Sequence, residues 1–243
     1  MKQNKYDDPD FFAEYAKMPR SIGGLEAAGE WHALRGELPD LKGKRVLDLG
    51  CGYGWHCRYA SEQGASSVVG IDISAKMIEK ARELTHMNNI RYERVAIEDL
   101  EAAAGSFDVV LSSLTLHYVR DIAPVFFKVA MLLKINGVFC YSVEHPVFTA
   151  RPQQDWWYNA EGNISHWPVD GYFQEGKRTT HFLGADVIKY HRTVASHFQA
   201  LHATGFQIDN LTEPVPQETM IKKMGWQDEK RRPMMLILRA TKK

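Results

Sequence analysis

The sequence predicts an α/β protein with a doubly wound, mostly parallel sheet, and three observations support this prediction. Hydrophobic strands alternate with amphipathic helices along most of the chain, which is typical of a parallel sheet covered on both faces. The first strand runs directly into a glycine turn at 50–54, where glycines permit backbone conformations that other residues avoid. The 243 residues suffice for one large domain with a complete core.

The expected elements follow one another as repeated β–α units. A buried strand at 46–49 leads through the glycine turn into a helix that begins near Trp55. The first N–H groups of that helix are free to bind a polar ligand. Ser74 can cap the next helix through its hydroxyl. The other strands are expected at 67–72, 90–95, 107–112, 138–143, 206–208 and 234–238, and later helices at 122–134 and 193–204.

Composition narrows the function classes. Lysine plus arginine and aspartate plus glutamate both number 30, so the formal net charge is zero, which argues against a dedicated nucleic-acid binder. Three cysteines cannot all pair, and their spacing matches no common zinc site. No hydrophobic run is long enough to cross a bilayer. We expect a cytoplasmic protein with no metal site and with neither nucleic acid nor membrane as a partner.

The glycine turn decides between two nucleotide cofactors. A dinucleotide fingerprint reads G-x-G-x-x-G, but Trp55 occupies the position of its third glycine. The string from Val46 to Gly54, with Asp48 two residues before Gly50, instead resembles motif I of the class I S-adenosylmethionine-dependent methyltransferases. The resemblance is closest to the small-molecule branch typified by quinone-biosynthesis methyltransferases. It implies S-adenosylmethionine as cofactor, S-adenosylhomocysteine as product, and a seven-stranded sheet in the order 3-2-1-4-5-7-6.

Candidate cofactor residues follow the strands, because ligands of such sheets bind beyond the carboxyl ends of the strands. Asp72 can accept hydrogen bonds from both hydroxyls of a ribose. Ala96 stands where many family members carry the aspartate that binds adenine, so adenine recognition is expected from residues 97 and 98. Arg20 can bind the methionine carboxylate with both arms of its guanidinium. We expect the cofactor to contact Arg20, Gly50, Cys51, Gly52, Trp55, Asp72, Ile73, Ile97, Glu98, Ser112 and Ser113.

The acceptor side is expected after the fourth and fifth strands. Methyl transfer from a sulfonium is an in-line displacement, and it requires a base only if the acceptor arrives protonated. His117 and His145 are the candidates for that base. The segment at 147–191 is too aromatic for a disordered linker. Its aromatic side chains predict an acceptor pocket that closes near Tyr15 and Arg20: Trp156, Trp157, Trp167, Tyr172 and Phe173.

These expectations combine into one methyltransferase domain over 1–243 that acts on a small-molecule acceptor. A helical cover is expected at 1–43, a cofactor-binding core at 44–146, an acceptor cover at 147–191, and a C-terminal helix and strands at 192–243. The sequence does not decide whether the protein forms a homodimer. The alternatives are a nicotinamide-dependent oxidoreductase, which shares the strand–turn–helix and the ribose-binding acid, and a non-catalytic module that binds S-adenosylmethionine.

Overall fold

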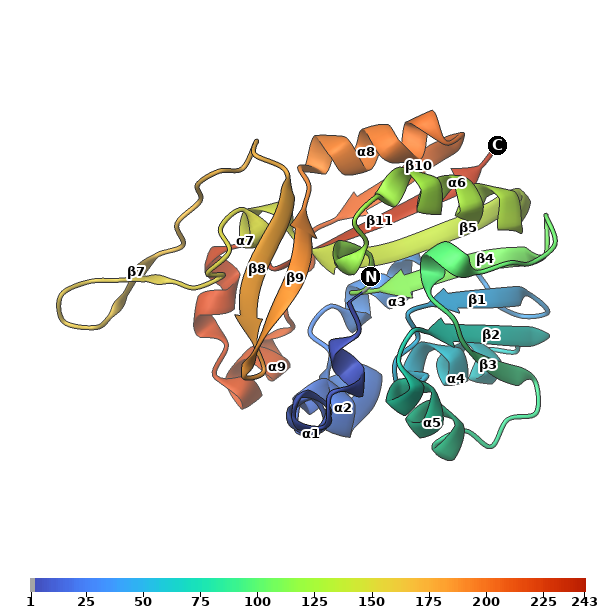
Figure 1. Cartoon of the computed structure of the whole chain (residues 1–243), viewed down its shortest axis with the longest axis horizontal. Coiled ribbons are helices and arrows are strands. Elements are labelled where there is room, and N and C mark those ends of the chain that lie inside the picture. Colours follow the sequence, from blue (N-terminus) through green and yellow to red (C-terminus); the bar gives the residue numbers. More distant parts are fainter. Residues whose placement is uncertain (1–2) are drawn as a thin grey trace.

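The computed structural model describes residues 3–243 and confirms the doubly wound sheet (Figure 1). Its seven strands lie in the order β3-β2-β1-β4-β5-β11-β10, which is the predicted order. The first five strands of the chain pair in parallel, whereas β11 is antiparallel to both of its neighbours. The strands are β1 (Arg45–Leu49), β2 (Ser67–Asp72), β3 (Ile90–Arg94), β4 (Phe107–Ser113), β5 (Leu133–Glu144), β10 (Phe206–Thr212) and β11 (Met235–Lys242).

Helices cover both faces of this sheet (Figure 1). One face packs against α6 (Ile122–Leu132) and α8 (Val194–Ala203). The other packs against α3 (Trp31–Glu37), α4 (Trp55–Glu62) and α5 (Ala75–Glu83). The predicted cap of α5 is present, because the Ser74 hydroxyl accepts a hydrogen bond of 3.1 Å from the Met77 N–H. Both layers are therefore fixed by the apolar periodicity of the sequence.

Strand β5 begins earlier than predicted. We expected Asn136-Gly137 to end the preceding helix and the strand to start at 138, but Leu133 already pairs with Phe107. The register then shifts so that Val109 faces Val138. Asn136 has a φ of 62°, so the residues read as a helix terminator form a bulge within the strand.

The N-terminal segment forms several short helices. Asp8 starts one of its helices by accepting hydrogen bonds from the N–H groups of Asp10 and Phe11. The elements before α3 are η1 (Lys5–Asp7), α1 (Pro9–Ala16), α2 (Pro19–Gly23) and η2 (Gly24–Ala27). They lie beside the carboxyl ends of the central strands (Figure 1).

The insert after β5 contains two small antiparallel sheets. The hairpin of β6 (Trp157–Tyr158) and β7 (Ile164–His166) projects away from the body of the molecule (Figure 1). The hairpin of β8 (Gly176–Phe182) and β9 (Ala185–His191) lies closer to the central sheet. The remaining short elements are η3 (Ile97–Asp99), η4 (Leu116–Tyr118), α7 (Pro146–Thr149), α9 (Glu218–Met224) and η5 (Gln227–Arg231). None of the helices within residues 3–243 has the length and apolar character to span a bilayer.

Candidate functional site

A cavity of about 690 Å³ lies at the carboxyl ends of the central strands, where ligands of doubly wound sheets bind. The N-terminal cover forms one wall with Tyr6, Tyr15 and Arg20, and the glycine turn and strand ends form the floor. The β8–β9 hairpin and the segment between β10 and β11 complete the enclosure. The site is thus assembled from segments far apart in the sequence, and its volume is in the range of small-molecule sites.

Two glycines of the turn serve different purposes. Gly50 has a φ of 77°, and a Cβ there would lie 2.3 Å from the Thr115 side chain. Gly52 has a φ of 51°, but a Cβ there would meet only the Tyr15 hydroxyl, at 4.0 Å. Gly50 is therefore required by packing, whereas Gly52 leaves open cavity space against the backbone. That space is a cradle in which a ligand can approach the main chain closely.

Asp72 is held between the glycine turn and the start of α5. Its Oδ2 accepts a hydrogen bond of 3.0 Å from the Gly52 N–H, and its Oδ1 accepts one of 2.9 Å from the Ser74 N–H. Burial raises the pKa of Asp72 to about 6, although these two N–H groups lower it. A carboxylate has about four acceptor positions, so each oxygen keeps capacity for a hydroxyl of a ligand. The pair of oxygens fits the two adjacent hydroxyls of a ribose.

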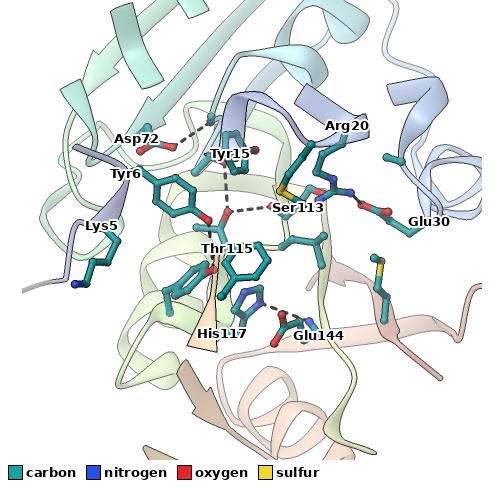
Figure 2. Close-up of a pocket in the computed structure, with 18 of the residues that line it drawn as sticks. Lys5, Tyr6, Tyr15, Arg20, Glu30, Asp72, Ser113, Thr115, His117 and Glu144 are labelled. Atoms are coloured by element: carbon teal, nitrogen blue, oxygen red, sulfur yellow. Dashed lines mark hydrogen bonds and ion pairs between the residues drawn. The ribbon is translucent and has the colours of Figure 1, made fainter. Parts of the chain in front are cut away.

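Arg20 and Glu30 form an ion pair at the other side of the cofactor region (Figure 2). Glu30 is only 2% exposed, and its Oε2 has no hydrogen-bond partner among the described residues. Burial would lower the pKa of Arg20, but Glu30 and Tyr15 outweigh that effect and raise it. The cavity thus offers a fixed positive and a fixed negative group side by side, which suits the carboxylate and ammonium of an amino acid.

Three tyrosines, Tyr6, Tyr15 and Tyr118, also line the cavity. The hydroxyls of Tyr6 and Tyr118 lie 3.3 Å apart, and the Tyr6 ring packs edge-on against Tyr15 at 5.2 Å between ring centres. Burial raises the pKa of all three phenols. They are therefore neutral at pH 7, and they present hydroxyl groups on otherwise apolar rings.

His117 lines the cavity beside Glu144 (Figure 2). Its Nδ1 accepts a long hydrogen bond of 3.5 Å from the Glu144 N–H. Burial lowers the pKa of His117 to about 4, although Glu144 opposes the shift. The ring is neutral at pH 7, and a proton acceptor at Nδ1 places the remaining proton on Nε2. His117 is thus built to donate a hydrogen bond from Nε2.

Comparisons with known proteins identify the class of the fold and site. A methyltransferase-domain family matches residues 47–141. An S-adenosylmethionine dependent methyltransferase from Mesorhizobium loti is 43% identical, with 90% of this chain and 100% of that chain covered and a TM-score of 0.84. A proposed enzyme of the same class from Listeria monocytogenes is 52% identical, with 89% and 99% covered and a TM-score of 0.83. The chain belongs to the S-adenosylmethionine-dependent methyltransferases.

The cofactor of the methyltransferase is S-adenosylmethionine, as predicted, and the nicotinamide alternative is wrong. An uncharacterized protein from Haemophilus influenzae is 32% identical over 99% of this chain and 98% of its own length. Two relatives with named acceptors match this chain over less than half of their own length. They are a ubiquinone biosynthesis O-methyltransferase from Neisseria meningitidis, 41% identical over 42% of this chain and 45% of that protein, and a tRNA U34 carboxymethyltransferase from Alcanivorax borkumensis, 32% identical over 46% and 34%.

Most of the predicted cofactor residues of the methyltransferase line the cavity: Arg20, Gly50, Gly52, Asp72, Ile73, Ile97, Glu98 and Ser113. Three others point elsewhere. The side chain of Cys51 packs in the core with Cys57, the Trp55 ring packs against Gly24 and Arg58, and the Ser112 hydroxyl donates to the Leu49 carbonyl at 2.8 Å. We therefore propose no cofactor contact for these three side chains.

His145 also lies outside the cavity lining of the methyltransferase. Its Nδ1 accepts a hydrogen bond of 3.0 Å from the Val147 N–H and caps the short helix α7. Its Nε2 lies 2.8 Å from Glu213 Oε1. Nδ1 thus holds the first turn of the insert, and Nε2 lies against a carboxylate of the segment between β10 and β11. We assign His145 a structural role and propose no catalytic role for it.

None of the five aromatic residues that were predicted to form the acceptor pocket of the methyltransferase lines the cavity. Trp156 and Trp167 pack against each other and against Arg232, while Trp157 is 54% and Phe173 is 88% exposed. Tyr172 packs against His191 instead of lining the cavity. The cavity is lined instead by residues of the β8–β9 hairpin: Phe182, Ile188 and Tyr190.

A local signal could have located this hairpin. Phe182 pairs with Ala185, so Leu183 and Gly184 form a two-residue turn. Both have positive φ, of 50° and 76°, as the tight turns of β-hairpins require. Gly184 between two runs of alternating side chains is a hairpin pattern, whereas the count of aromatic residues carries no directional information.

Proposed function

We propose that this methyltransferase transfers the methyl group of S-adenosylmethionine to a small molecule enclosed in the cavity. The enclosure itself carries the proposal, because the N-terminal cover and the β8–β9 hairpin wall off one shared space of about 690 Å³. Such a space suits a cofactor together with a compact acceptor. The partial relatives carry names of both small-molecule and tRNA enzymes, so the acceptor class is inferred from the cavity.

The charges around the cavity argue against a nucleic-acid acceptor. Binding of a polyanion depends on lysine and arginine that neutralise its phosphates. Five acidic residues line the cavity and only three basic ones, Lys5, Arg20 and Arg120. With a formal net charge of zero for the whole chain, neither the cavity nor the overall charge favours RNA.

The cofactor is proposed to lie along the turn and the strand ends. We assign the ribose to Asp72, the adenine to the wall formed by Ile73, Ile97 and Glu98, and the methionine end to Ser113. Arg20 would bind the carboxylate of the methionine, and Glu30 would accept from its ammonium. The fit rests on the open cradle at Gly52, the spare acceptor positions of Asp72 and the unpartnered oxygen of Glu30.

Catalysis by the chain is then proposed to consist mainly of alignment and exclusion of water. When bound, the cofactor supplies a methyl group on a positively charged sulfur. Tyr6, Tyr15 and Tyr118 shield this region from solvent. His117, neutral and protonated on Nε2, orients the acceptor by donating a hydrogen bond, and it does not remove a proton. Proximity and orientation alone can supply several kcal/mol of the barrier, up to about 10.

Tritiated S-adenosylmethionine offers a direct test. Transfer of label to small organic molecules of a metabolite extract is the expected result, with no label on bulk tRNA. The variant Asp72→Ala should lose transfer together with affinity for S-adenosylhomocysteine. Label on tRNA alone would refute the small-molecule acceptor. Binding of the cofactor with no transfer in either extract would favour a non-catalytic module.

A further inference from the structure

A partly buried polar triad connects the β8–β9 hairpin to the central sheet. It consists of Glu144 at the end of β5, Lys189 in β9, and Gln154 in the loop between α7 and β6. The Lys189 Nζ donates to Glu144 Oε1 at 2.5 Å and to Gln154 Oε1 at 3.0 Å. Gln154 Nε2 donates to Glu144 Oε2 at 2.8 Å. Each member is thus held by the other two.

Of the three triad residues, only Glu144 lines the cavity. Glu144 lines the cavity next to His117, whereas Lys189 is 2% exposed and does not line it. Figure 2 places Glu144 and His117 at the opposite side of the site from Asp72, with Thr115 between them. Each Glu144 oxygen accepts one hydrogen bond from the triad, and a carboxylate can accept about four. Spare acceptor capacity therefore remains on the cavity side.

The charged and titratable groups that face Glu144 are Lys189 from β9 and His117 and Tyr118 from η4. Burial alone would raise the pKa of Glu144. The positive charge of His117 at low pH, the ammonium of Lys189 and the hydrogen bonds from Lys189 and Gln154 outweigh burial, so the pKa lies below its ordinary value. At neutral pH Glu144 is an anion that accepts hydrogen bonds and is a poor base.

The surroundings of the triad indicate which ligand group it can recognise. Phe182, Ile188 and Tyr190 make this part of the cavity largely apolar. A buried ion pair is seldom more stabilising than apolar residues of the same size, so its presence here points to specificity. The carboxylate repels an anionic ligand. A cationic ligand would approach the Lys189 ammonium, which already neutralises the carboxylate.

We propose that Glu144 binds a neutral hydrogen-bond donor, a hydroxyl or N–H group, on an otherwise apolar methyl acceptor. Lys189 and Gln154 are positioning residues that hold the carboxylate in place and ionised. The inference rests on the proposed small-molecule methyltransferase function and deepens it by naming the class of acceptor. Glu144 anchors the acceptor at this donor group, and the donor group need not be the atom that is methylated.

Matched probes test this on the full-length protein saturated with S-adenosylhomocysteine. Phenol and indole carry a neutral donor, while anisole and N-methylindole are their capped counterparts. Benzylamine and benzoate supply a cation and an anion. Binding is measured by ligand-observed NMR titration between pH 6 and pH 8. We expect each donor to bind roughly tenfold tighter than its capped counterpart, as for a hydrogen bond to a charged group, and more tightly than either ion.

The variant Lys189→Met separates positioning from mere structural support. Without the ammonium, burial should raise the pKa of Glu144, and the preference for donors should fade as the pH drops from 8 to 6. In the wild type the preference should stay constant over that range. Lys177→Met makes the same change on the exposed face of β8 and should behave as the wild type. If Lys189→Met does not fold, Gln154→Gly is the second variant, since Gln154 has a φ of 50° that suits glycine.

Equal binding of donors and capped probes, or tightest binding of benzylamine, would overturn the proposal. So would a preference that stays independent of pH in both triad variants. Calorimetry with S-adenosylhomocysteine is run separately on every protein. Failure of that binding in the wild type would refute the cofactor function itself, whereas intact binding without donor preference refutes only the role of Glu144.

Discussion

Single residues of the glycine turn define what the cofactor region can accept. Gly52 donates its N–H to Asp72, and on its other side it faces open cavity. One residue thus fixes the carboxylate and leaves room for the ligand that the carboxylate would bind. A side chain at position 52 would still allow the hydrogen bond from its N–H to Asp72, but it would fill the cavity space next to the backbone.

Gly52→Ala is expected to abolish measurable binding of S-adenosylhomocysteine while the protein still folds. The positive φ of 51° costs an alanine about 1–2 kcal/mol, and its methyl group would occupy the cradle. Gly105→Ala is the matched control, because Gly105 has a φ of 64° and nothing within 4 Å of its Cβ position. It should lose similar stability and keep full affinity by calorimetry. Equal affinity in both variants would contradict the cradle.

Asp48 in β1 predicts an unusual dependence of stability on pH. It is 1% exposed and accepts a hydrogen bond of 3.3 Å from the Cys57 thiol. Burial raises its pKa to about 7, although that thiol lowers it. The folded state therefore binds the proton more tightly than the unfolded state between about pH 4 and pH 7. The free energy of unfolding contributed by this group falls across that window and is constant above it.

Asp48→Asn should accordingly gain stability relative to the wild type as the pH rises. The gain between pH 5 and pH 8 is at most on the order of 3 kcal/mol, from about 1.4 kcal/mol per pKa unit, and urea unfolding measures it. Asp108→Asn is the control, because the pKa of Asp108 is shifted in the opposite direction: hydrogen bonds from Lys134 and Arg45 outweigh burial and lower it. Its difference from the wild type should be the same at both pH values. A constant difference for Asp48→Asn would show that this carboxyl titrates normally.

At the scale of elements, the N-terminal cover is tied to both halves of the site. Asp7 at the end of η1 accepts hydrogen bonds from the Ser74 hydroxyl at 2.6 Å and the Lys76 N–H at 3.1 Å, both at the start of α5. Gln3 accepts one of 2.7 Å from the Ile188 N–H in β9. The segment that carries Tyr6 therefore joins the cofactor region to the acceptor cover.

Asp7→Ala should speed the dissociation of S-adenosylhomocysteine by about fivefold, because losing a cap-like interaction costs on the order of 1 kcal/mol. Stopped-flow displacement measures the rate. Asp10→Ala removes a nearby exposed carboxylate from the first turn of α1 and should leave the rate unchanged. Identical rates for all three proteins would mean that this cover does not hold the cofactor.

The insert divides into a part that lines the cavity and a part that does not. Replacing residues 157–166, the β6–β7 hairpin, by two glycines should preserve both cofactor affinity and methyl transfer, since its strands project from the body (Figure 1). Phe182→Ala should lower transfer by roughly tenfold through lost apolar contact and keep cofactor affinity. The tritium assay compares them. Loss of transfer in the hairpin deletion alone would restore the acceptor pocket predicted from the tryptophans.

Across the whole molecule, the sequence predicted features that depend on neighbouring residues and missed features that depend on contacts between distant ones. Strand and helix positions follow from periodicity, and the resemblance at the glycine turn supplied the strand order. Side-chain direction was harder to predict. Ser112 and Ser113 were both expected at the cofactor, but neighbours in a strand point to opposite faces, and only Ser113 lines the cavity. The triad joins Lys189 to Glu144 and Gln154, which lie 45 and 35 positions earlier in the chain, and no local pattern in the sequence reveals this contact.

Ligand binding should stabilise the whole fold, because the cavity contacts segments from both ends of the chain. S-adenosylhomocysteine at 100 times its dissociation constant adds about 2.7 kcal/mol. For a chain of this length that raises the melting temperature by about 5–10 °C. NAD at the same concentration should produce no shift. A shift with NAD and none with S-adenosylhomocysteine would contradict the cofactor assignment.

The place of β11 between β5 and β10 has a consequence for synthesis on the ribosome. Translation proceeds from the N-terminus, and domains begin to fold as they emerge. Strand β10 is made before β11 but pairs with no other strand, and one edge of β5 waits for the same partner. Until residues 235–242 leave the exit tunnel, β10 has no partner on either edge and one edge of β5 stays unpaired. We expect the half-made protein to depend on chaperones that shield such edges.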